Sequence, residues 1–559
     1  MRYKSGIEVD TVIYAQIRQD MSSYPNMVTH EDGTVTVRQV NSSYFLNSDQ
    51  WRIYKLQAIH QFQPMIKEFM TERSRKTIYF DFDNETLNLE VKYIFFKRLF
   101  NQNWKISTIF QSLQNPLKRL TEFINEQYTT LSSFQQLKID KAEQEYIEWL
   151  NNQGIRTKRI KRQPFYNDVE IKTSVVAILR TLYTDFIKFA NQQEEWKKDI
   201  WDVRKLNESF GVKYNQTSAN YYLNFSKIEQ ENLRSNIKMY FRQRLISKHK
   251  FAWNTAINYM NVLSKFFSFL NEMEDKRIEL KYIDRYHIEA YIHYLHEYAN
   301  QFEHRGANPE RYIASSLRVV KKFLKDLQKY EYDIAPLKNI DHLIYIEDIP
   351  KRHIKSNSQI NYIPDYVLRQ LFHCLDDLDR DMQAIVWIAY KTGLRASDIL
   401  TLTADCLIQL NGQYWLETDL QKSHVKGHRI PIDDELATIV LELIDQSRQN
   451  RQGRKLLFVR NQGSRYGQPI DQSFVRLALN KFSYRNQIKD ESGNIFHFTL
   501  HQFRHTYAMK LLNGGADIYL VQDLMGHLSL SMTMKYAKLL DQTKREVFNS
   551  IVQQGVFRV

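Results

Sequence analysis

A chain of 559 residues is too long for one hydrophobic core, so we expect two to four domains. Its 43% hydrophobic and 25% charged residues are typical of a globular protein and exclude an intrinsically disordered one. Lys and Arg outnumber Asp and Glu by 78 to 64, a net charge of +14, which favours a polyanion such as nucleic acid as the partner.

The cysteines and the apolar runs narrow the protein class further. Cys374 and Cys406 lack a C-x-x-C spacing, so neither a disulfide framework nor a cysteine zinc site is supported. Residues 1–10 lack the apolar segment of a signal peptide, and runs such as 384–390 are far too short to span a membrane. We therefore expect a soluble, cytoplasmic protein.

The N-terminal part combines strand and turn signals. Residues 27–40 alternate apolar and polar side chains around Asp32 and Gly33, which predicts a β-hairpin, and residues 76–85 predict a further strand. Amphipathic helical spacing follows at residues 113–125, 177–191, 256–272 and 314–329. The four segments share no fixed period, which argues against a solenoid.

Short basic runs recur at residues 156–162, 248–250 and 351–355. A single run of this kind is most often a solvated surface, but the repetition favours nucleic acid as the partner.

The second half of the chain is predicted to follow an interdomain linker. Residues 331–364 contain Pro336, Pro350 and Pro364, which indicates an extended segment. Beyond it we expect a helix that begins at Asp365, a buried helix that ends at Gly393, a two-stranded hairpin within 413–432, and helices again from residue 471 onward.

Candidate functional residues occur in five segments of this last region. Each alone has an ordinary structural interpretation, such as a surface arginine, a helix-end histidine or a core tyrosine. The candidates are Arg395, a hairpin lysine at 422 or 426, His501 with Arg504, His527 after a glycine, and Tyr536.

A zinc site is one alternative, because His501 and His505 have the i, i+4 spacing of a metal-binding pair. A zinc hydrolase of that type needs a glutamate directly after the first histidine. Gln502 occupies that position, which argues against the metal.

Taken together, the order Arg, Lys, His-x-x-Arg, Gly-His, Tyr resembles the active site of the tyrosine recombinase (phage integrase) family. The flanking segments "TGLRASDI", "HQFRHT", "MGHLSLSMTMKYA" and "YIPDYVLRQL" are similar to those of the family, and the resemblance covers residues 170–559. Residues 532–543 resemble large transposases of unit transposons that carry an N-terminal extension. The hairpin is about one residue longer than usual, so the catalytic lysine is Lys422 or Lys426.

The resemblance implies the chemistry of each residue. Two arginines, Arg395 and Arg504, would neutralise the anionic phosphate oxygens through planar, bidentate contacts. Tyr536 would be the nucleophile, and His501 would accept its proton. His527 would hydrogen-bond the scissile phosphate.

A lysine on the hairpin, preferably Lys422, would protonate the leaving 5′ oxygen. The resulting 3′-phosphotyrosyl bond conserves the energy of the broken bond, so the resemblance implies neither a cofactor nor a metal. A turn that contains Ser529, Ser531 and Thr533 would let the Tyr536 segment move separately from His527.

The fold class implied is mainly α with small β-sheets, in which a helical core-binding domain precedes a mixed α/β tyrosine-recombinase catalytic domain. We predict an N-terminal extension at 1–165, a helical DNA-binding domain at 166–335, a linker at 336–356 and the catalytic domain with its tail at 357–559. The implied partner is double-stranded DNA, bound by a homo-tetramer, with accessory transposition proteins as further candidates. The expected processes are DNA recombination, integration and transposition of a mobile element.

Other functions remain open at this point. A catalytically inactive or regulatory DNA-binding protein of the same fold is the main alternative, and a topoisomerase or a zinc hydrolase are others. The tail, residues 537–559, has roughly helical apolar spacing and is predicted to dock either on its own domain or on a neighbouring protomer.

Overall fold

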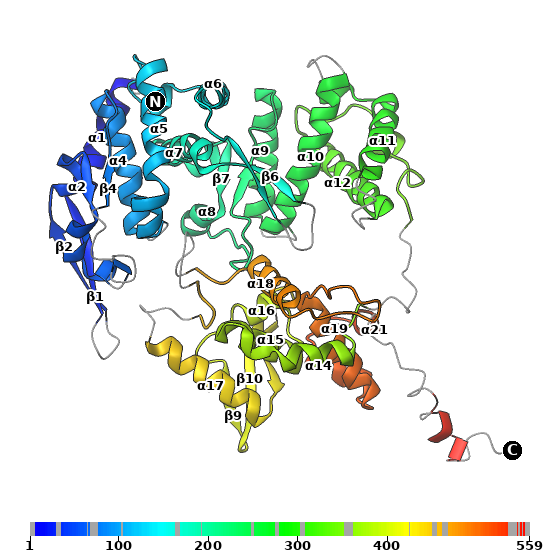
Figure 1. Ribbon diagram of the computed structural model, residues 1–559. Coiled ribbons are helices and arrows are strands. Elements are labelled where there is room, and N and C mark those ends of the chain that lie inside the picture. Colours follow the sequence, from blue (N-terminus) through cyan, green and yellow to red (C-terminus); the bar gives the residue numbers. More distant parts are fainter. Residues whose placement is uncertain are drawn as a thin grey trace.

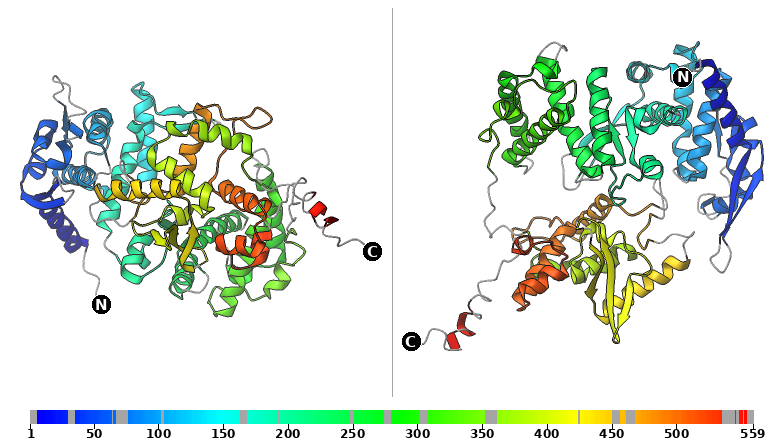
Figure 2. Two further views of the ribbon diagram at one scale, coloured as in Figure 1. Left: turned by 90° about the horizontal axis from the view of Figure 1, so that it is seen from below. Right: turned by 180° about the vertical axis from the view of Figure 1, so that it is seen from behind.

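The structure, a computed structural model, describes residues 6–29, 35–63, 65–66, 76–101, 104–162, 168–191, 193–247, 251–273, 279–301, 308–351, 361–423, 425–449, 456–460, 468–534, 545, 548–550 and 552–553. Their buried hydrophobic side chains form three large clusters in chain order and one small cluster after the third. The elements of the third and small clusters, α14 to α21, lie on one side of the other two clusters (Figures 1 and 2).

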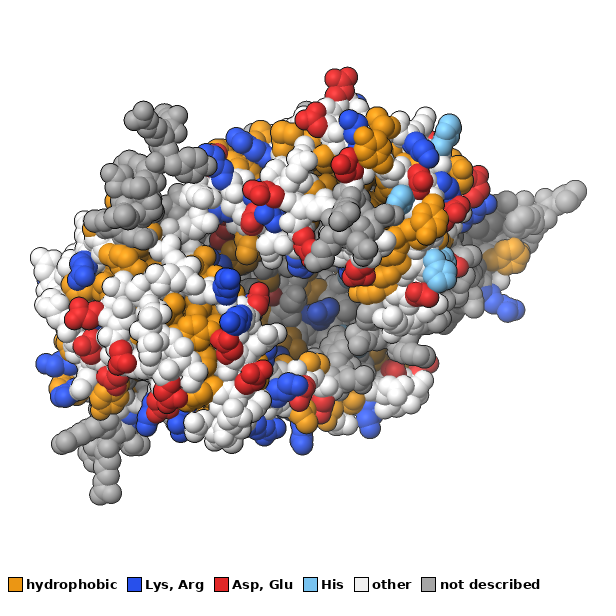
Figure 3. Space-filling model, turned by 90° about the horizontal axis from the view of Figure 1, so that it is seen from above, with side chains coloured by type: hydrophobic (Ala, Val, Ile, Leu, Met, Phe, Trp, Pro, Cys, Tyr) orange, Lys and Arg blue, Asp and Glu red, His pale blue; other side chains and the backbone are white. Residues whose placement is uncertain are grey.

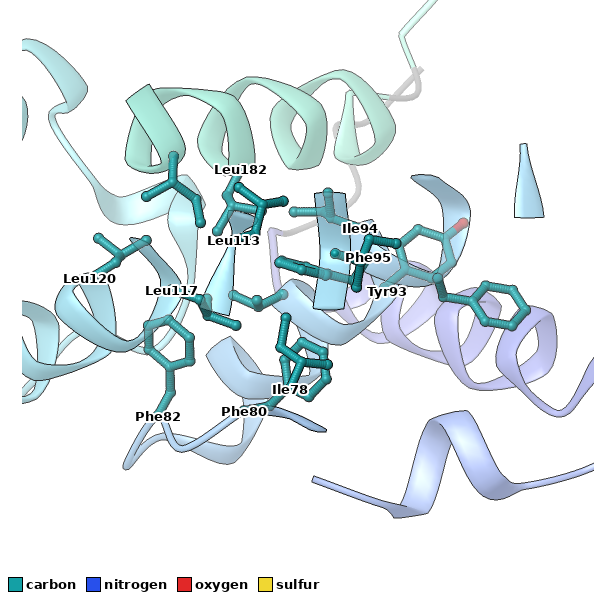
Figure 4. Packing of buried hydrophobic residues seen from close by; sticks show 14 of the residues in the cluster. Ile78, Phe80, Phe82, Tyr93, Ile94, Phe95, Leu113, Leu117, Leu120 and Leu182 are labelled. Atoms are coloured by element: carbon teal, nitrogen blue, oxygen red, sulfur yellow. The ribbon is translucent and has the colours of Figure 1, made fainter. Parts of the chain in front are cut away.

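The first cluster contains buried residues from Ile13 to Ala190. Its elements are α1 (Gly6–Met21), β1 (Ser23–Thr29), β2 (Val35–Asn41), α2 (Tyr44–Asn47), β3 (Gln50–Arg52), β4 (Thr77–Tyr79), α4 (Glu85–Phe100), α5 (Gln114–Gln127), α6 (Ile139–Asn152), β5 (Lys158–Lys161), β6 (Val169–Lys172) and α7 (Ser174–Ala190). Figure 4 shows Phe80 and Phe95 packed with leucines of α5 and α7. A fully buried Leu or Phe of this kind contributes about 1.5–3 kcal/mol.

The predicted N-terminal elements are confirmed. Strands β1 and β2 are antiparallel, with Thr29 paired to Val35 on either side of the predicted turn. Strand β4 lies within the predicted segment 76–85, and the Asn84 side chain then caps α4 by accepting the backbone N–H of Leu87. The four predicted helices are α5, α7, α10 and α12.

The second cluster contains buried residues from Trp196 to Ile344. Its elements are β7 (Ile200–Asp202), α8 (Val203–Phe210), β8 (Tyr222–Asn224), α9 (Glu231–Ile246), α10 (Trp253–Met273), α11 (Arg285–Asn300), α12 (Pro309–Lys329) and α13 (Ile340–Leu343). Among the described residues, no helix is long and apolar enough to cross a membrane.

The buried clusters extend past two of the boundaries expected from the sequence. Helix α7 packs with the first cluster although it follows residue 165, because its apolar face contacts α5 and α6. Helix α13 lies within the linker predicted at 336–356. Ile340, Leu343 and Ile344 have helical spacing and are fully buried against the second cluster, so the chain stays attached there.

The third cluster contains buried residues from Ile363 to Phe503, and the small cluster follows it from Ala508 to Met525. The elements are α14 (Asp365–His373), α15 (Arg380–Thr392), α16 (Ala396–Ile399), β9 (Leu407–Leu410), β10 (Gln413–Leu420), β11 (Val425–Pro431), α17 (Asp434–Gln449), α18 (Gln472–Arg485), α19 (Leu500–Asn513), α20 (Ile518–Leu524) and α21 (Leu530–Met534). The three strands form one antiparallel sheet in the order β11-β10-β9.

The predicted helix starts and the hairpin of this region are confirmed, but strand β9 was not predicted. It pairs with β10 through a two-residue turn at Asn411 and Gly412, whose φ angles are +50° and +77°. Asn-Gly is the sequence preferred for such a turn, because both of its residues adopt positive φ. The signal was therefore present in the sequence.

Several polar contacts between described residues join the second cluster to the third, and the Tyr221 hydroxyl lies 3.5 Å from Oε1 of Gln468. The backbone N–H of Gln472 donates to the carbonyl of Thr217 at 3.2 Å, and the Gln472 amide donates to the Thr217 hydroxyl at 3.1 Å. Thr217 is fully buried by this contact.

Candidate functional site

Arg395 lies in the turn between α15 and α16. Helix α15 ends with Gly393 at a φ of +61°, a left-handed cap that glycine adopts without strain. A Cβ at this position would lie 2.4 Å from Cδ1 of Tyr507, so α19 packs directly against the turn. The turn therefore holds Arg395 next to the helix that carries the His-x-x-Arg motif.

The guanidinium of Arg395 is only partly engaged. Its Nη1 is 3.9 Å from Oδ2 of the fully buried Asp398, too far for a hydrogen bond. That nitrogen is itself buried and has no hydrogen-bond partner among the described residues. A buried cationic donor without an acceptor is unfavourable, and an incoming anion would satisfy it.

Arg504 is almost fully buried on α19 and joins three separate segments. Its Nη1 donates to the carbonyl of Gly393 at 2.8 Å, and its Nη2 donates to the carbonyl of Met525 at 2.5 Å. Nη2 also lies 2.8 Å from Nε2 of His527. Arg504 thus links the α15–α16 turn to the segment between α20 and α21.

His527 is buried at the end of that segment and has a defined tautomer. A guanidinium only donates, so Nε2 of His527 accepts from Arg504 and its proton resides on Nδ1. Nδ1 then donates to the hydroxyl of Thr533 at 2.9 Å. Gly526 precedes it at a φ of +57°, and a Cβ there would lie 2.0 Å from Cδ1 of Leu420.

Thr533 ties α21 to His527. The sequence predicts that the Ser/Thr-rich turn lets the Tyr536 segment move separately from His527, and Tyr536 itself lies outside the described residues. Thr533 is fully buried on α21 and hydrogen-bonded to His527, and the short helix packs against α20. Ser529 and Ser531 are exposed, and their hydroxyl oxygens lie 3.0 Å apart, within hydrogen-bond distance.

Lys422 lies in the turn between β10 and β11, and Lys426 lies four residues later in β11; both are exposed. Thr418 of β10 pairs with His428 of β11, and Leu420 pairs with Val425. Between these two pairs the chain advances by two residues in β10 but by three in β11, so β11 has one extra residue. This bulge accounts for the extra residue inferred from the sequence. It falls in the part of β11 that contains Lys426.

Asp398 connects this turn to Arg395, and the sequence analysis did not single it out. Its Oδ1 accepts the backbone N–H of Gln421 at 3.1 Å, directly before Lys422. Burial raises the pKa of the Asp398 carboxyl, and the Gln421 N–H and Arg395 oppose that effect. The sequence does contain a sign of this contact, because Asp398 is an acidic residue three positions after Arg395.

His428 is a second connection that the sequence analysis missed. It is buried on β11, and its Nε2 lies 3.0 Å from the carbonyl oxygen of Leu524. The sheet is therefore tied to the end of α20, next to Gly526.

His501 lies one turn before Arg504 at the surface end of α19. Burial of part of the ring and the nearby cations Arg504, Lys422 and Arg395 lower its pKa. The charge of Lys422, in the turn between β10 and β11, thus contributes to the lowered pKa of His501 on α19. The ring is therefore neutral at pH 7 and able to accept a proton.

His505 packs edge-on against His501, with ring centroids 4.5 Å apart. Burial, His501 and Arg504 lower the pKa of His505 to about 4. Within the described ranges, no group of three or more His, Cys, Asp or Glu side chains is placed to hold a metal ion.

The structure brings together five of the six predicted site residues. Arg395, Lys422, His501, Arg504 and His527 are linked by the contacts and electrostatic effects above. Tyr536 lies outside the described residues.

Residues 361–543 match the model of the Phage integrase family. The chain carries a phage integrase domain. The curated relatives that it matches are transposases and tyrosine recombinases, enzymes that break and rejoin DNA strands.

Similarity to curated proteins extends beyond residues 361–543. Transposase B from transposon PsiTn554 of Staphylococcus aureus is 28% identical over 477 residues, which are 85% of this chain and 72% of that protein. Tyrosine recombinase XerC of Rickettsia prowazekii (strain Madrid E) is 27% identical over 330 residues, 56% of this chain and 94% of that protein. The crystal structure of XerH site-specific recombinase bound to palindromic difH substrate covers 59% of this chain and 92% of its own, at 17% identity and a TM-score of 0.40.

Proposed function

We propose that this chain is a transposase of the integrase type, which cuts and rejoins double-stranded DNA through a 3′-phosphotyrosyl bond to Tyr536. The observation that carries the proposal is the pair of arginines. Arg504 is buried and fixed by three contacts, and Arg395 beside it keeps a buried Nη1 that has no acceptor among the described residues. This arrangement suits an anionic group such as a phosphodiester.

The arginines would stabilise the charge that develops on the non-bridging oxygens as the phosphorus is attacked. Arginine is suited to this because its planar guanidinium remains charged and can contact two oxygens at once. Because their positions are fixed by the fold, little reorganisation would be needed when DNA binds.

Proton transfer would involve His501 and Lys422. The Oη of Tyr536 forms a bond to phosphorus while the bond from phosphorus to the 5′ oxygen breaks. His501, whose pKa is lowered, accepts the tyrosine proton, and the ammonium of Lys422 donates a proton to the leaving oxygen. Attack by a 5′ hydroxyl of another strand reverses each transfer and rejoins the DNA.

His527 would contact the same phosphate. Its Nε2 now accepts from Arg504, so this nitrogen cannot donate to a phosphate in its present tautomer. Nε2 could donate to the phosphate only after it leaves Arg504 and takes up a proton from solvent, which makes the ring an imidazolium. The bond from Nδ1 to Thr533 would be kept and would hold the ring in place.

The relatives narrow the biological role. Transposase B from PsiTn554 shares 85% of the length of this chain, which favours transposition over other reactions of the family. We propose a homo-tetramer on paired DNA sites, with accessory transposition proteins as further partners. The alternative is an inactive DNA-binding protein of the same fold, and a test of cleavage separates the two.

The test is capture of a covalent adduct on nicked duplexes that carry the ends of the mobile element. The chain should form a denaturation-resistant adduct without added metal or ATP. Tyr536→Phe should abolish the adduct and change DNA affinity by less than about tenfold, because only the nucleophilic oxygen is removed. An adduct formed by this variant would refute the assignment of Tyr536.

The matched control is Tyr519→Phe, since Tyr519 is an exposed tyrosine on the neighbouring helix α20. This variant should form the adduct at the rate of the parent chain. A parent chain that binds the duplex but never forms an adduct would favour the inactive DNA-binding alternative.

A further inference from the structure

The hairpin β5–β6 projects from the first cluster without a covering layer. Lys158 pairs with Lys172 and Lys161 pairs with Val169. Of the eight strand residues, only Ile171 is partly shielded and the others are exposed. In Figure 1, β6 lies on the side of α7 that faces away from α5. Each strand is about 13 Å long, at 3.3 Å per residue.

The base of the hairpin is firmly attached to the first cluster. The Thr173 backbone N–H donates to the carbonyl of Thr157 at 2.9 Å, and its hydroxyl donates to the carbonyl of Arg156 at 3.1 Å. Lys172 and Arg180 both form ion pairs with the buried carboxylate of Glu143. A two-stranded hairpin is only marginally stable alone, so these contacts at its base fix its position.

The two faces of the hairpin differ in charge. One face carries Lys158 and Lys172, and both are neutralised, Lys158 by Glu170 at 2.9 Å and Lys172 by Glu143 at 2.9 Å.

The other face carries Arg159 and Lys161, opposite Ile171 and Val169. Neither cation forms an ion pair with any of the described residues, and the same holds for the exposed Arg162 that follows. We call Arg159, Lys161 and Arg162 the hairpin cations.

This concentration of unpaired positive charge is a local feature. Over the face of the molecule shown in Figure 3, basic and acidic side chains are interspersed. Glu170 contacts Lys158, Glu143 contacts Lys172 and Arg180, and the exposed Asp168 directly precedes β6. The hairpin cations themselves form no ion pair with the described residues.

We propose that the hairpin cations bind the phosphate backbone of the DNA substrate, outside the base pairs at the cleavage site. The inference rests on the proposed function, which supplies the duplex as the partner. An exposed two-stranded ribbon can approach a groove. Arg159 and Lys161 on one face, and Arg162 just beyond β5, could then reach the phosphates that border it. The aliphatic pair Val169 and Ile171 on the same face would contact sugars rather than solvent.

The size of the effect follows from counterion release. Each phosphate neutralised contributes about 0.9 to the slope of log affinity against log salt, so loss of three contacts should reduce that slope by about 2.7. At about 0.1 M salt we expect the affinity to fall by at least about tenfold.

The experiment uses the full chain and duplexes with the ends of the element and long flanks. Arg159→Ala, Lys161→Ala and Arg162→Ala are combined in one variant, and binding is measured over a range of salt concentrations. The matched control removes three exposed lysines from the same domain, Lys118, Lys138 and Lys141, each changed to Ala. The hairpin variant should lose slope and affinity as stated, and the control should stay within about twofold of the parent.

A hairpin variant that matches the control in both slope and affinity would overturn the proposal. A second variant, Arg159→Lys with Arg162→Lys, should keep the parent slope, because a phosphate contact requires only positive charge. Loss of the slope in this variant as well would indicate a folding defect and would count against the proposal.

The covalent adduct distinguishes this proposal from the proposed function. The hairpin variant should form the adduct to the parent extent at saturating protein, because the site residues are intact. If the parent shows no adduct but the slope falls in the variant, the hairpin proposal holds and the proposed function fails. If the adduct forms and the salt slope of the hairpin variant equals that of the parent, the proposed function holds and the hairpin proposal fails. If the hairpin variant differs from the parent only when an accessory protein is added, the hairpin binds a protein instead of DNA, and the proposal also fails.

Discussion

Gly393→Ala should impair the site through one steric contact. Gly393 ends α15 at a φ of +61°, and its carbonyl accepts the Arg504 Nη1 proton at 2.8 Å. Alanine at this φ costs about 1–2 kcal/mol. In addition, its Cβ would lie 2.4 Å from Cδ1 and 3.0 Å from Cβ of Tyr507, and relief of such overpacking costs about 1–3 kcal/mol more.

Gly211→Ala is the matched control for this prediction. Gly211 caps α8 at a φ of +67°, and a Cβ there would meet nothing within 4 Å, so only the backbone term applies. The difference between the variants is therefore the steric term, about 1–3 kcal/mol, or roughly five- to 150-fold in the population that keeps Arg504 in place.

The assay is the initial rate of adduct formation at saturating DNA, together with thermal unfolding of each variant. Gly393→Ala should slow the adduct by that factor and lower the melting temperature of the catalytic domain. Gly211→Ala should leave the adduct rate unchanged. Equal adduct rates for the two variants would refute the idea that the contact between Gly393 and Tyr507 positions Arg504.

Three further predictions concern the partners of the site. Thr533→Val should slow adduct formation by about tenfold, since it removes the hydroxyl that accepts from the buried His527 Nδ1, whereas Thr533→Ser should restore most of the rate. Neutral His505 should stabilise the fold at pH 7, and this contribution, on the order of 2 kcal/mol, should be lost progressively as the pH falls from 6.5 to about 4, because the pKa of His505 is lowered in the folded state. A His505→Gln variant whose free energy of unfolding falls with acid in the same way as that of the parent would contradict this. Lys422→Ala should regain cleavage on a DNA substrate whose 5′ leaving group needs no proton, and rescue of Lys426→Ala instead would assign the general acid to the bulge.

The sequence by itself determined the local structure of this protein. Apolar residues at i, i+3 or i+4 and i+7 gave α5, α7, α10 and α12 close to their true bounds, since that spacing places one apolar face on a helix. Gly393 marked the end of α15 because a left-handed cap favours glycine. The order of Arg395, Lys422, His501, Arg504 and His527 also identified residues that the fold brings together.

Only the tertiary structure decided how these residues are held. The bonds from Arg504 to Gly393, from Gln421 to Asp398 and from His428 to Leu524 join positions 111, 23 and 96 residues apart. Helical spacing shows which face of an element is apolar but not which distant element covers it. The same reason explains why α7 joined the first cluster and why the buried bond between His527 and Thr533 was not expected from the sequence.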